Sequence, residues 1–150
     1  MTLNTGMMSS NRTDWETPPD FFKGLDQEFH FTLDVCATRK NAKCKHYYSP
    51  KVDGLKQDWE GVCWLNPPYG KSIGEWVRKA YLEARKEGVV VVGLLPARTD
   101  TAYFHDYIYG KAEIRFIRGR LKFVGAKNSA PFPSMVVIWR KNVKSKIRKG

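Results

Sequence analysis

The chain has few cysteines, few histidines and no long apolar segment. Its 150 residues include three cysteines and three histidines, and no two cysteines have the C-x-x-C spacing of a zinc or redox pair. Neither a disulfide framework nor a metal site is therefore expected. No apolar run approaches the ~20 residues that span a membrane, and the N-terminus lacks the pattern of a signal peptide. We expect a cytoplasmic protein that binds neither metal nor membrane.

Acidic residues are also scarce relative to basic ones. The chain carries 26 lysines and arginines against 15 aspartates and glutamates, a formal net charge of +11. Part of this excess lies in residues 141–150, which we expect to form a basic C-terminal tail. A clear positive excess remains in the rest of the chain, which favours a polyanionic partner, with nucleic acid as the first candidate.

The pattern of apolar residues predicts alternating helices and strands in one domain, 14–140, after a flexible N-terminus, 1–13. Helices are expected at 20–29, at 71–88 and from 99 or 100 to 109, and strands at 31–36, 62–65, 89–95, 112–117, 120–124 and 135–139. Alternating strands and helices followed by a run of strands predict an α/β sheet with an antiparallel finish. A hydrophobic content of 42% is enough to fill its core.

Residues 62–70, V-C-W-L-N-P-P-Y-G, combine an apolar strand with two prolines. The strand must end at Pro67 and Pro68, which have no backbone N–H and which stiffen the turn that follows. The Asn66 amide and the Pro67 carbonyl offer hydrogen-bond acceptors, and the Tyr69 ring offers a stacking face. This set suits a planar group with an exocyclic amine, although Asn-Pro is also a common start to an ordinary turn.

Several segments that end predicted strands should meet at one edge of the sheet. Asp34, Asn66 and residues 96–98 each follow a predicted strand. Ligands of open α/β sheets bind outside the carboxyl ends of the strands. The sequence therefore predicts a ligand site at this edge, although Asp34 could instead cap a turn.

Eight motifs occur in order between residues 15 and 139. They are W-E-T-P-P at 15–19, L-D-V-C-A at 33–37, N-A-K-C at 41–44, D-G-L-K-Q-D-W at 53–59, N-P-P-Y-G at 66–70, L-L-P-A-R-T-D-T at 94–101, G-R-L-K-F at 119–123 and A-P-F-P-S at 130–134. Together they resemble the phage-type DNA N6-adenine methyltransferase (Dam) family. The resemblance implies a Rossmann-like methyltransferase sheet, a phage or prophage origin, and methyl transfer from S-adenosylmethionine to adenine N6 in double-stranded DNA.

The resemblance also implies roles for individual residues. The catalytic residues would be Asn66, Pro67, Pro68 and Tyr69, which would hold an adenine flipped out of the duplex. The cofactor-binding residues would be Trp15, Thr17, Pro18, Asp34, Cys36 and Asp58. One departure is that residues 34–38 lack the glycine-rich turn usual after the first strand. The acidic residue that usually binds the ribose hydroxyls has no clear counterpart either, with Asp53 a possibility.

Basic residues near the same edge are candidates for contacts with DNA phosphates. We expect Arg98, Arg118, Arg120 and Lys122 to bind DNA, with Arg115 also plausible, because alternation would place several of them on one side of an extended segment. An ordinary solvated face is the alternative for any one of them.

Two other functions stay open from the sequence. NPPY suits any planar amide or amine, so a protein glutamine N5-methyltransferase is one alternative. A catalytically inactive DNA-binding module is the other. The sequence predicts neither the target DNA sequence nor the oligomeric state.

Overall fold

The computed structural model describes residues 14–141 and 146–149. The predicted flexible N-terminus, 1–13, lies outside the described residues, as do residues 142–145 and 150 of the predicted basic tail. None of the helices in the described ranges is long and apolar enough to cross a membrane.

The described residues form an α/β fold, as the sequence predicts, with one six-stranded sheet. One of its strands, Lys146–Lys149, lies in the segment 141–150 that the sequence predicts to be a tail. Its strands are β1 (Leu33–Asp34), β2 (Val62–Leu65), β3 (Val90–Pro96), β4 (Glu113–Phe116), β5 (Ser134–Arg140) and β6 (Lys146–Lys149). The helices are α2 (Pro19–Phe29), the 3-10 helix η1 (Gly54–Lys56), α3 (Ile73–Glu83) and α4 (Ala102–Tyr107). The sheet order is β1-β2-β3-β5-β4-β6.

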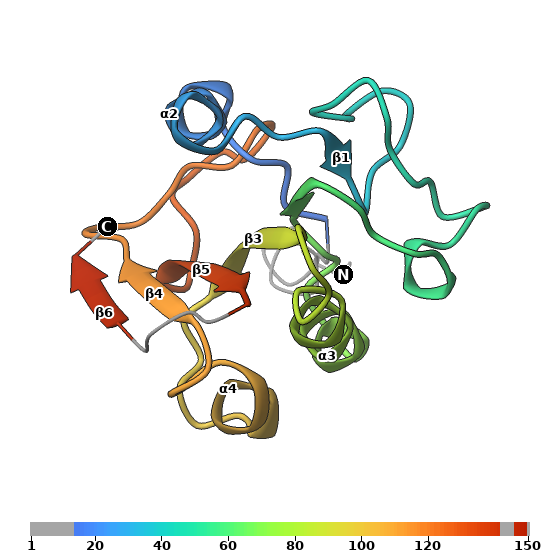
Figure 1. The fold of residues 1–150 in the computed structure, drawn as a ribbon. Coiled ribbons are helices and arrows are strands. Elements are labelled where there is room, and N and C mark those ends of the chain that lie inside the picture. The colour runs from blue at the N-terminus through green and yellow to red at the C-terminus, as the bar shows by residue number, and fades with distance from the viewer. Residues whose placement is uncertain (1–13, 142–145, 150) are drawn as a thin grey trace.

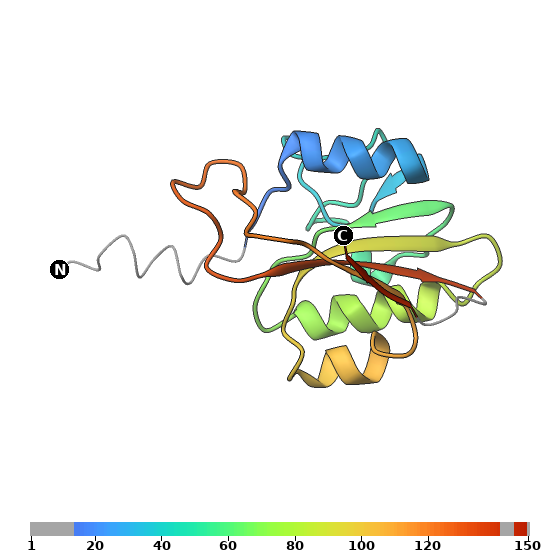
Figure 2. The same cartoon turned by 90° about the vertical axis from the view of Figure 1, so that its left-hand side faces the viewer.

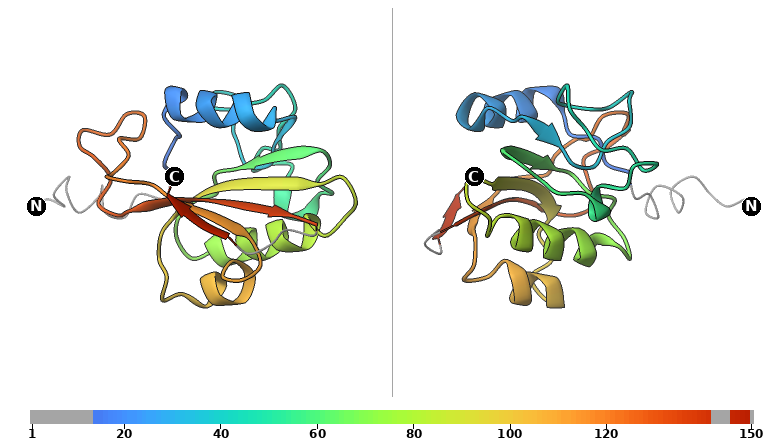
Figure 3. Two further views of the ribbon diagram at one scale, coloured as in Figure 1. Left: turned by 60° about the vertical axis from the view of Figure 1, so that its left-hand side comes forward. Right: turned by 45° about the vertical axis from the view of Figure 1, so that its right-hand side comes forward.

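The sheet is mixed and is covered on both faces. β1, β2 and β3 are parallel to one another, β5 is antiparallel to both β3 and β4, and β6 is parallel to β4. Helix α2 lies over one face, whereas α3 and α4 lie over the other (Figures 1 and 2). Two further views show the same three layers (Figure 3). β2 ends directly before Asn66 and the two prolines, as expected.

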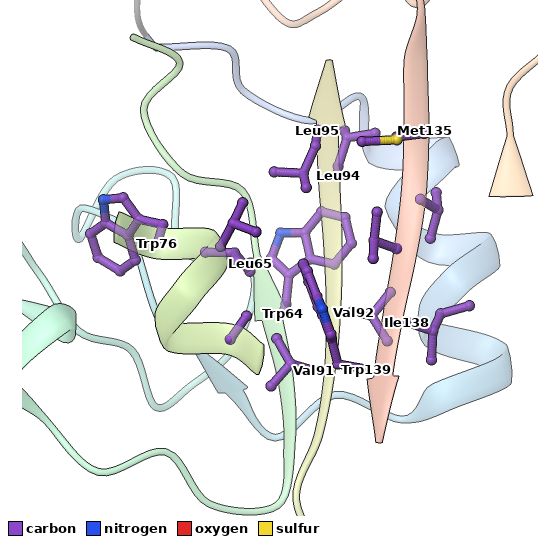
Figure 4. Packing of buried hydrophobic residues seen from close by; sticks show 14 of the residues in the cluster. Trp64, Leu65, Trp76, Val91, Val92, Leu94, Leu95, Met135, Ile138 and Trp139 are labelled. Carbon is purple, nitrogen blue, oxygen red and sulfur yellow. The ribbon is translucent and has the colours of Figure 1, made fainter. Parts of the chain in front are cut away.

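The core lies on the central strands, and Figure 4 shows its packing. β3 and β5 are buried along nearly their whole length. Trp64 of β2 packs on Phe22 of α2, with ring centroids 5.2 Å apart. Trp139 of β5 packs on the opposite face of the sheet, which α4 covers, and its indole Nε1 donates to the Tyr107 carbonyl of α4 at 2.7 Å. Gly93 leaves room for this indole, because a Cβ there would lie 3.3 Å from the Trp139 ring.

Two predicted strands differ from the structure. The segment 31–36 pairs as a strand only at Leu33 and Asp34. The strand predicted at 120–124 is wrong, because this segment belongs to the irregular connection 117–133 between β4 and β5. Its backbone hydrogen bonds run elsewhere: the Ala130 N–H donates to the Leu121 carbonyl at 2.7 Å.

A buried carboxylate fastens the β6 edge of the sheet. Glu113 of β4 is 1% exposed and accepts hydrogen bonds from Arg115, Arg140 and Arg148 at 2.9, 3.1 and 3.2 Å. Arg115 also pairs with Glu28 of α2 at 2.7 Å. Burial alone would raise the pKa of Glu113, but the hydrogen bond and charge of Arg115, with the charges of Arg140 and Arg148, outweigh burial and lower it. The network ties α2, β4, β5 and β6 together.

Candidate active site

A pocket of about 230 Å³ opens at the carboxyl ends of β1 and β2. Three segments supply most of its lining: the chain before α2, the chain after β1 and the turn after β2. Its lining residues are Asp14, Trp15, Glu16, Thr17, Asp34, Cys36, Ala37, Thr38, Asn41, Lys43, Pro50, Trp64, Asn66, Pro67, Pro68 and Val124. The pocket thus occupies the edge at which the sequence predicts a ligand site.

Most of the predicted catalytic and cofactor-binding residues line this pocket. Those in the lining are Trp15, Thr17, Asp34, Cys36, Asn66, Pro67 and Pro68. Pro18, Asp58 and Tyr69 are not part of it. Pro18 precedes α2, where its carbonyl accepts from the Phe22 N–H at 3.1 Å. Asp58 is exposed, and its carbonyl accepts from the Tyr48 hydroxyl at 2.8 Å.

The Asn66 side chain has one satisfied end and one free end. Its Nδ2 donates to the Trp15 carbonyl and, at 3.0 Å, to the Thr17 hydroxyl oxygen. A carbonyl oxygen can only accept, so the amide nitrogen must face Trp15 and the amide oxygen must face away. Asn66 Oδ1 is buried and has no hydrogen-bond partner within the described part of the chain. A buried acceptor of this kind is costly unless a ligand satisfies it.

Tyr69 is more deeply buried than the sequence suggests. Its ring is 7% exposed and packs edge-on against Phe132 and Phe123, with centroids 5.5 and 6.4 Å apart. Its hydroxyl donates to the Leu94 carbonyl of β3 at 2.9 Å. Burial, with a smaller contribution from Tyr103, raises the pKa of Tyr69 well above its usual value. Tyr69 therefore anchors the turn after β2 to β3 in this conformation.

Asp34 places a carboxylate in the pocket wall. It is 2% exposed, and its two oxygens accept from the backbone N–H groups of Cys36 at 3.3 Å and Lys43 at 3.0 Å. Burial raises the pKa of Asp34 to about 6, while these N–H groups and the Lys43 charge act in the opposite direction. The group is therefore mostly ionised at neutral pH.

The pocket lining includes the thiol of Cys36, a predicted cofactor-binding residue, and also Lys43 and Glu16, for which the sequence predicts no role. Burial, followed by the nearby carboxylates of Asp34, Asp14 and Asp53, raises the pKa of Cys36 to about 12, so the thiol stays protonated at neutral pH. Lys43 pairs with Glu16 at 3.6 Å. Lys43 belongs to the N-A-K-C motif, but no local pattern reveals that its backbone N–H serves Asp34.

The predicted DNA-binding residues lie outside the pocket. Arg98, Arg118, Arg120 and Lys122 are all exposed. The Arg98 guanidinium lies 5.9 Å from the centroid of the Phe132 ring. Arg115 does not fit this group, because Glu28 and Glu113 engage its guanidinium. Among residues 14–141 and 146–149, no group of three or more His, Cys, Asp or Glu residues is placed to hold a metal ion.

Comparisons with known proteins show the family of the chain. The DNA N-6-adenine-methyltransferase of Haemophilus phage HP1 (strain HP1c1) is 31% identical over 128 residues, which cover 83% of this chain and 73% of the relative. The "Putative methyltransferase YfdM" of Escherichia coli (strain K12) is 36% identical over 63 residues, which cover 37% of this chain and 69% of the relative. The sequence model of the family described as "DNA N-6-adenine-methyltransferase (Dam)" matches residues 4–148. The chain therefore belongs to the DNA N-6-adenine-methyltransferase (Dam) family.

Proposed function

We propose that this DNA adenine N6-methyltransferase binds S-adenosylmethionine in the pocket at the ends of β1 and β2, and that Asn66 and Pro67 hold the N6 amine of an adenine flipped out of double-stranded DNA. The observation that carries the proposal is the buried, unpartnered Asn66 Oδ1 in the described structure. An exocyclic amine supplies the N–H donor that this oxygen lacks. The phage HP1 relative supports the expected phage origin.

The chain's own residues position the amine rather than supply a nucleophile. The Asn66 side-chain oxygen and the Pro67 carbonyl accept hydrogen bonds from the two N6–H groups. This arrangement directs the nitrogen lone pair toward the methyl group. When bound, S-adenosylmethionine supplies an electrophilic methyl group on a positively charged sulfur. On transfer, the electron pair of the broken carbon–sulfur bond would stay on the sulfur, which becomes neutral, and the proton that N6 loses would pass to water. The fixed amide orientation needs no rearrangement at this step.

The pocket suits such a cofactor in its electrostatics. The Asp34 carboxylate is mostly ionised at neutral pH and lies in the wall, where it favours a cationic group. The pocket lining also includes Trp15, Thr17 and Cys36. Pro18 and Asp58 stay predictions for this role. The parallel strands β1–β3 with β5 antiparallel beside β3 support a Rossmann-like methyltransferase sheet.

Tyr69 stacks on the flipped base only after its surroundings move. In the structure, Phe132 and Phe123 of the connection 117–133 pack against its ring. We therefore assign Tyr69 the role of anchoring the turn through Leu94. Stacking of its ring on the flipped base stays a prediction, because Phe132 and Phe123 occupy the ring in this structure.

The test is methyl transfer from labelled S-adenosylmethionine to unmethylated duplex DNA, with the product nucleosides separated. We expect the label in N6-methyladenine. Label in a protein glutamine, with none in DNA, would instead establish the glutamine methyltransferase. If the chain binds duplex DNA but labels neither DNA nor protein, the catalytically inactive DNA-binding module remains.

The exposed basic residues Arg118 and Arg120 are proposed to contact DNA phosphates, together with Arg98 and Lys122. Replacing both Arg118 and Arg120 with Gln should weaken duplex binding. It should also reduce the slope of log Kd against log salt concentration by about 1 for each lost phosphate contact. Fluorescence anisotropy with labelled duplex over a salt series measures both quantities.

The matched control removes the same charge from another surface. Arg78 of α3 and Arg85, just beyond its end, are also exposed, and replacing both with Gln should leave the salt slope unchanged. An equal loss in the two double variants would show that net charge alone governs binding and that Arg118 and Arg120 make no specific contact.

A further inference from the structure

We propose that the segment before α2 sets the orientation of the catalytic amide. The Trp15 carbonyl and the Thr17 hydroxyl hold Asn66 with its oxygen free, which makes Thr17 a positioning residue for methyl transfer. This inference rests on the proposed role of Asn66 and adds to it. Thr17 lines the pocket, but here it acts through Asn66.

The need for such a device follows from the chemistry of an amide side chain. Its two ends have nearly the same shape but opposite hydrogen-bonding character. If the Asn66 amide turned over, its NH₂ group would face the N6 amine, and two donors would oppose each other. The free energy that separates the two orientations therefore sets the fraction of enzyme that can accept the N6–H bond.

Two acceptors hold the amide nitrogen in one position. The Trp15 carbonyl accepts one N–H, and Thr17 Oγ1, 3.0 Å from Nδ2, accepts the other. Thr17 is 1% exposed, so water cannot easily replace its bond. Both acceptors lie about fifty residues before Asn66 in the chain, so only tertiary packing keeps them in place.

Aromatic packing fixes the position of the Trp15 carbonyl. The Trp15 ring contacts Phe132 and Phe123, with centroids 5.1 and 5.4 Å apart. In the same segment, the Glu16 carbonyl accepts from the Val124 N–H at 3.0 Å. The segment before α2 is thus held against the connection 117–133 on one side and against Asn66 on the other.

The direct test uses nuclear magnetic resonance on the ¹⁵N-labelled full chain, free of DNA and cofactor. The Asn66 NH₂ signals are assigned by their loss in Asn66→Ala. In the wild type they should be well separated and exchange slowly with water. In Thr17→Val, which keeps the side-chain shape but removes the acceptor, they should shift and exchange several-fold faster. In Thr17→Ser, which keeps the hydroxyl, they should stay close to the wild-type values.

Kinetics provide the second readout. At saturating DNA and S-adenosylmethionine, Thr17→Val should lower kcat by about three- to tenfold, the size expected for the loss of one hydrogen bond. Thr17→Ser should stay within about twofold of the wild type, and thermal unfolding checks that both variants fold. Unchanged Asn66 signals in Thr17→Val, or an equal kcat loss in Thr17→Ser, would overturn the inference.

The two readouts separate failure of this inference from failure of the proposed function. The NH₂ signals report the amide orientation even in a protein that methylates nothing. If the wild-type signals exchange as fast as those of a solvated amide, the positioning role is wrong, whatever Asn66→Ala does to activity.

Discussion

Asn66→Ala is expected to reduce kcat for DNA methylation by about 100-fold or more, because it removes the side-chain acceptor for the N6 amine. Losses of this order follow the removal of a preorganised polar group from an active site. The Michaelis constant for DNA should change little, since phosphate contacts supply most of the affinity. Transfer of labelled methyl groups under saturating conditions measures kcat, and calorimetric titration with S-adenosylmethionine measures cofactor binding separately.

Gln27→Ala is the matched control for this change. It also removes an amide side chain, but from the exposed surface of α2, so activity should equal that of the wild type. Near-normal methylation by Asn66→Ala, with the fold intact, would remove Asn66 from the mechanism. Loss of cofactor binding in Asn66→Ala would mean that Asn66 serves the cofactor rather than the amine.

Glu113→Gln is expected to lower the free energy of unfolding by about 2 kcal/mol, because a neutral amide weakens the charge-assisted hydrogen bonds that the buried carboxylate accepts from three arginines. The substitution keeps the size of the side chain, so packing changes little. Arg115, Arg140 and Arg148 lose the carboxylate that they share. Urea unfolding followed by tryptophan fluorescence measures the effect.

The same variant should change how stability depends on pH. The folded pKa of Glu113 lies below the ordinary value of 4.5. Its contribution is therefore fully present above about pH 4.5 and is lost as the pH falls through the folded pKa. Glu113→Gln should thus destabilise the protein at pH 7 and have a smaller effect at the acid end.

Glu87→Gln is the control for the network. Glu87 is exposed and pairs with Lys141, and surface pairs of this kind contribute little to stability. Its unfolding curve should match that of the wild type. Equal effects of the two substitutions would show that the buried network adds nothing beyond overall charge.

Much of the fold follows from local patterns in the sequence. The apolar run 89–95 predicts a central strand, and β3 is central, with β5 paired along its whole length. Pro67 and Pro68 predict the end of β2 for a local steric reason. The same patterns bring Asp34 and Asn66 to one edge, because the carboxyl ends of parallel strands meet there.

Other features depend on contacts that no local pattern contains. Arg115 has the charge and position of a phosphate contact, but Glu28, 87 residues earlier, engages it. Tyr69 follows a rigid turn, yet Phe132 of a distant segment packs against its ring. The orientation of the Asn66 amide depends on Trp15 and Thr17 in the same way. Long-range partners, rather than residue type, decide which of these polar groups are free.

The two-residue length of β1 has a consequence for the local stability of the pocket wall. β1 pairs with β2 only at Leu33 and Asp34, and the next 27 residues up to β2 contain only the short η1 as a regular element. The other side of Asp34 is held by the backbone of the same segment, through hydrogen bonds with His46 and Tyr48. Amide hydrogens of this wall should therefore exchange with water sooner than those of the β3–β5 core.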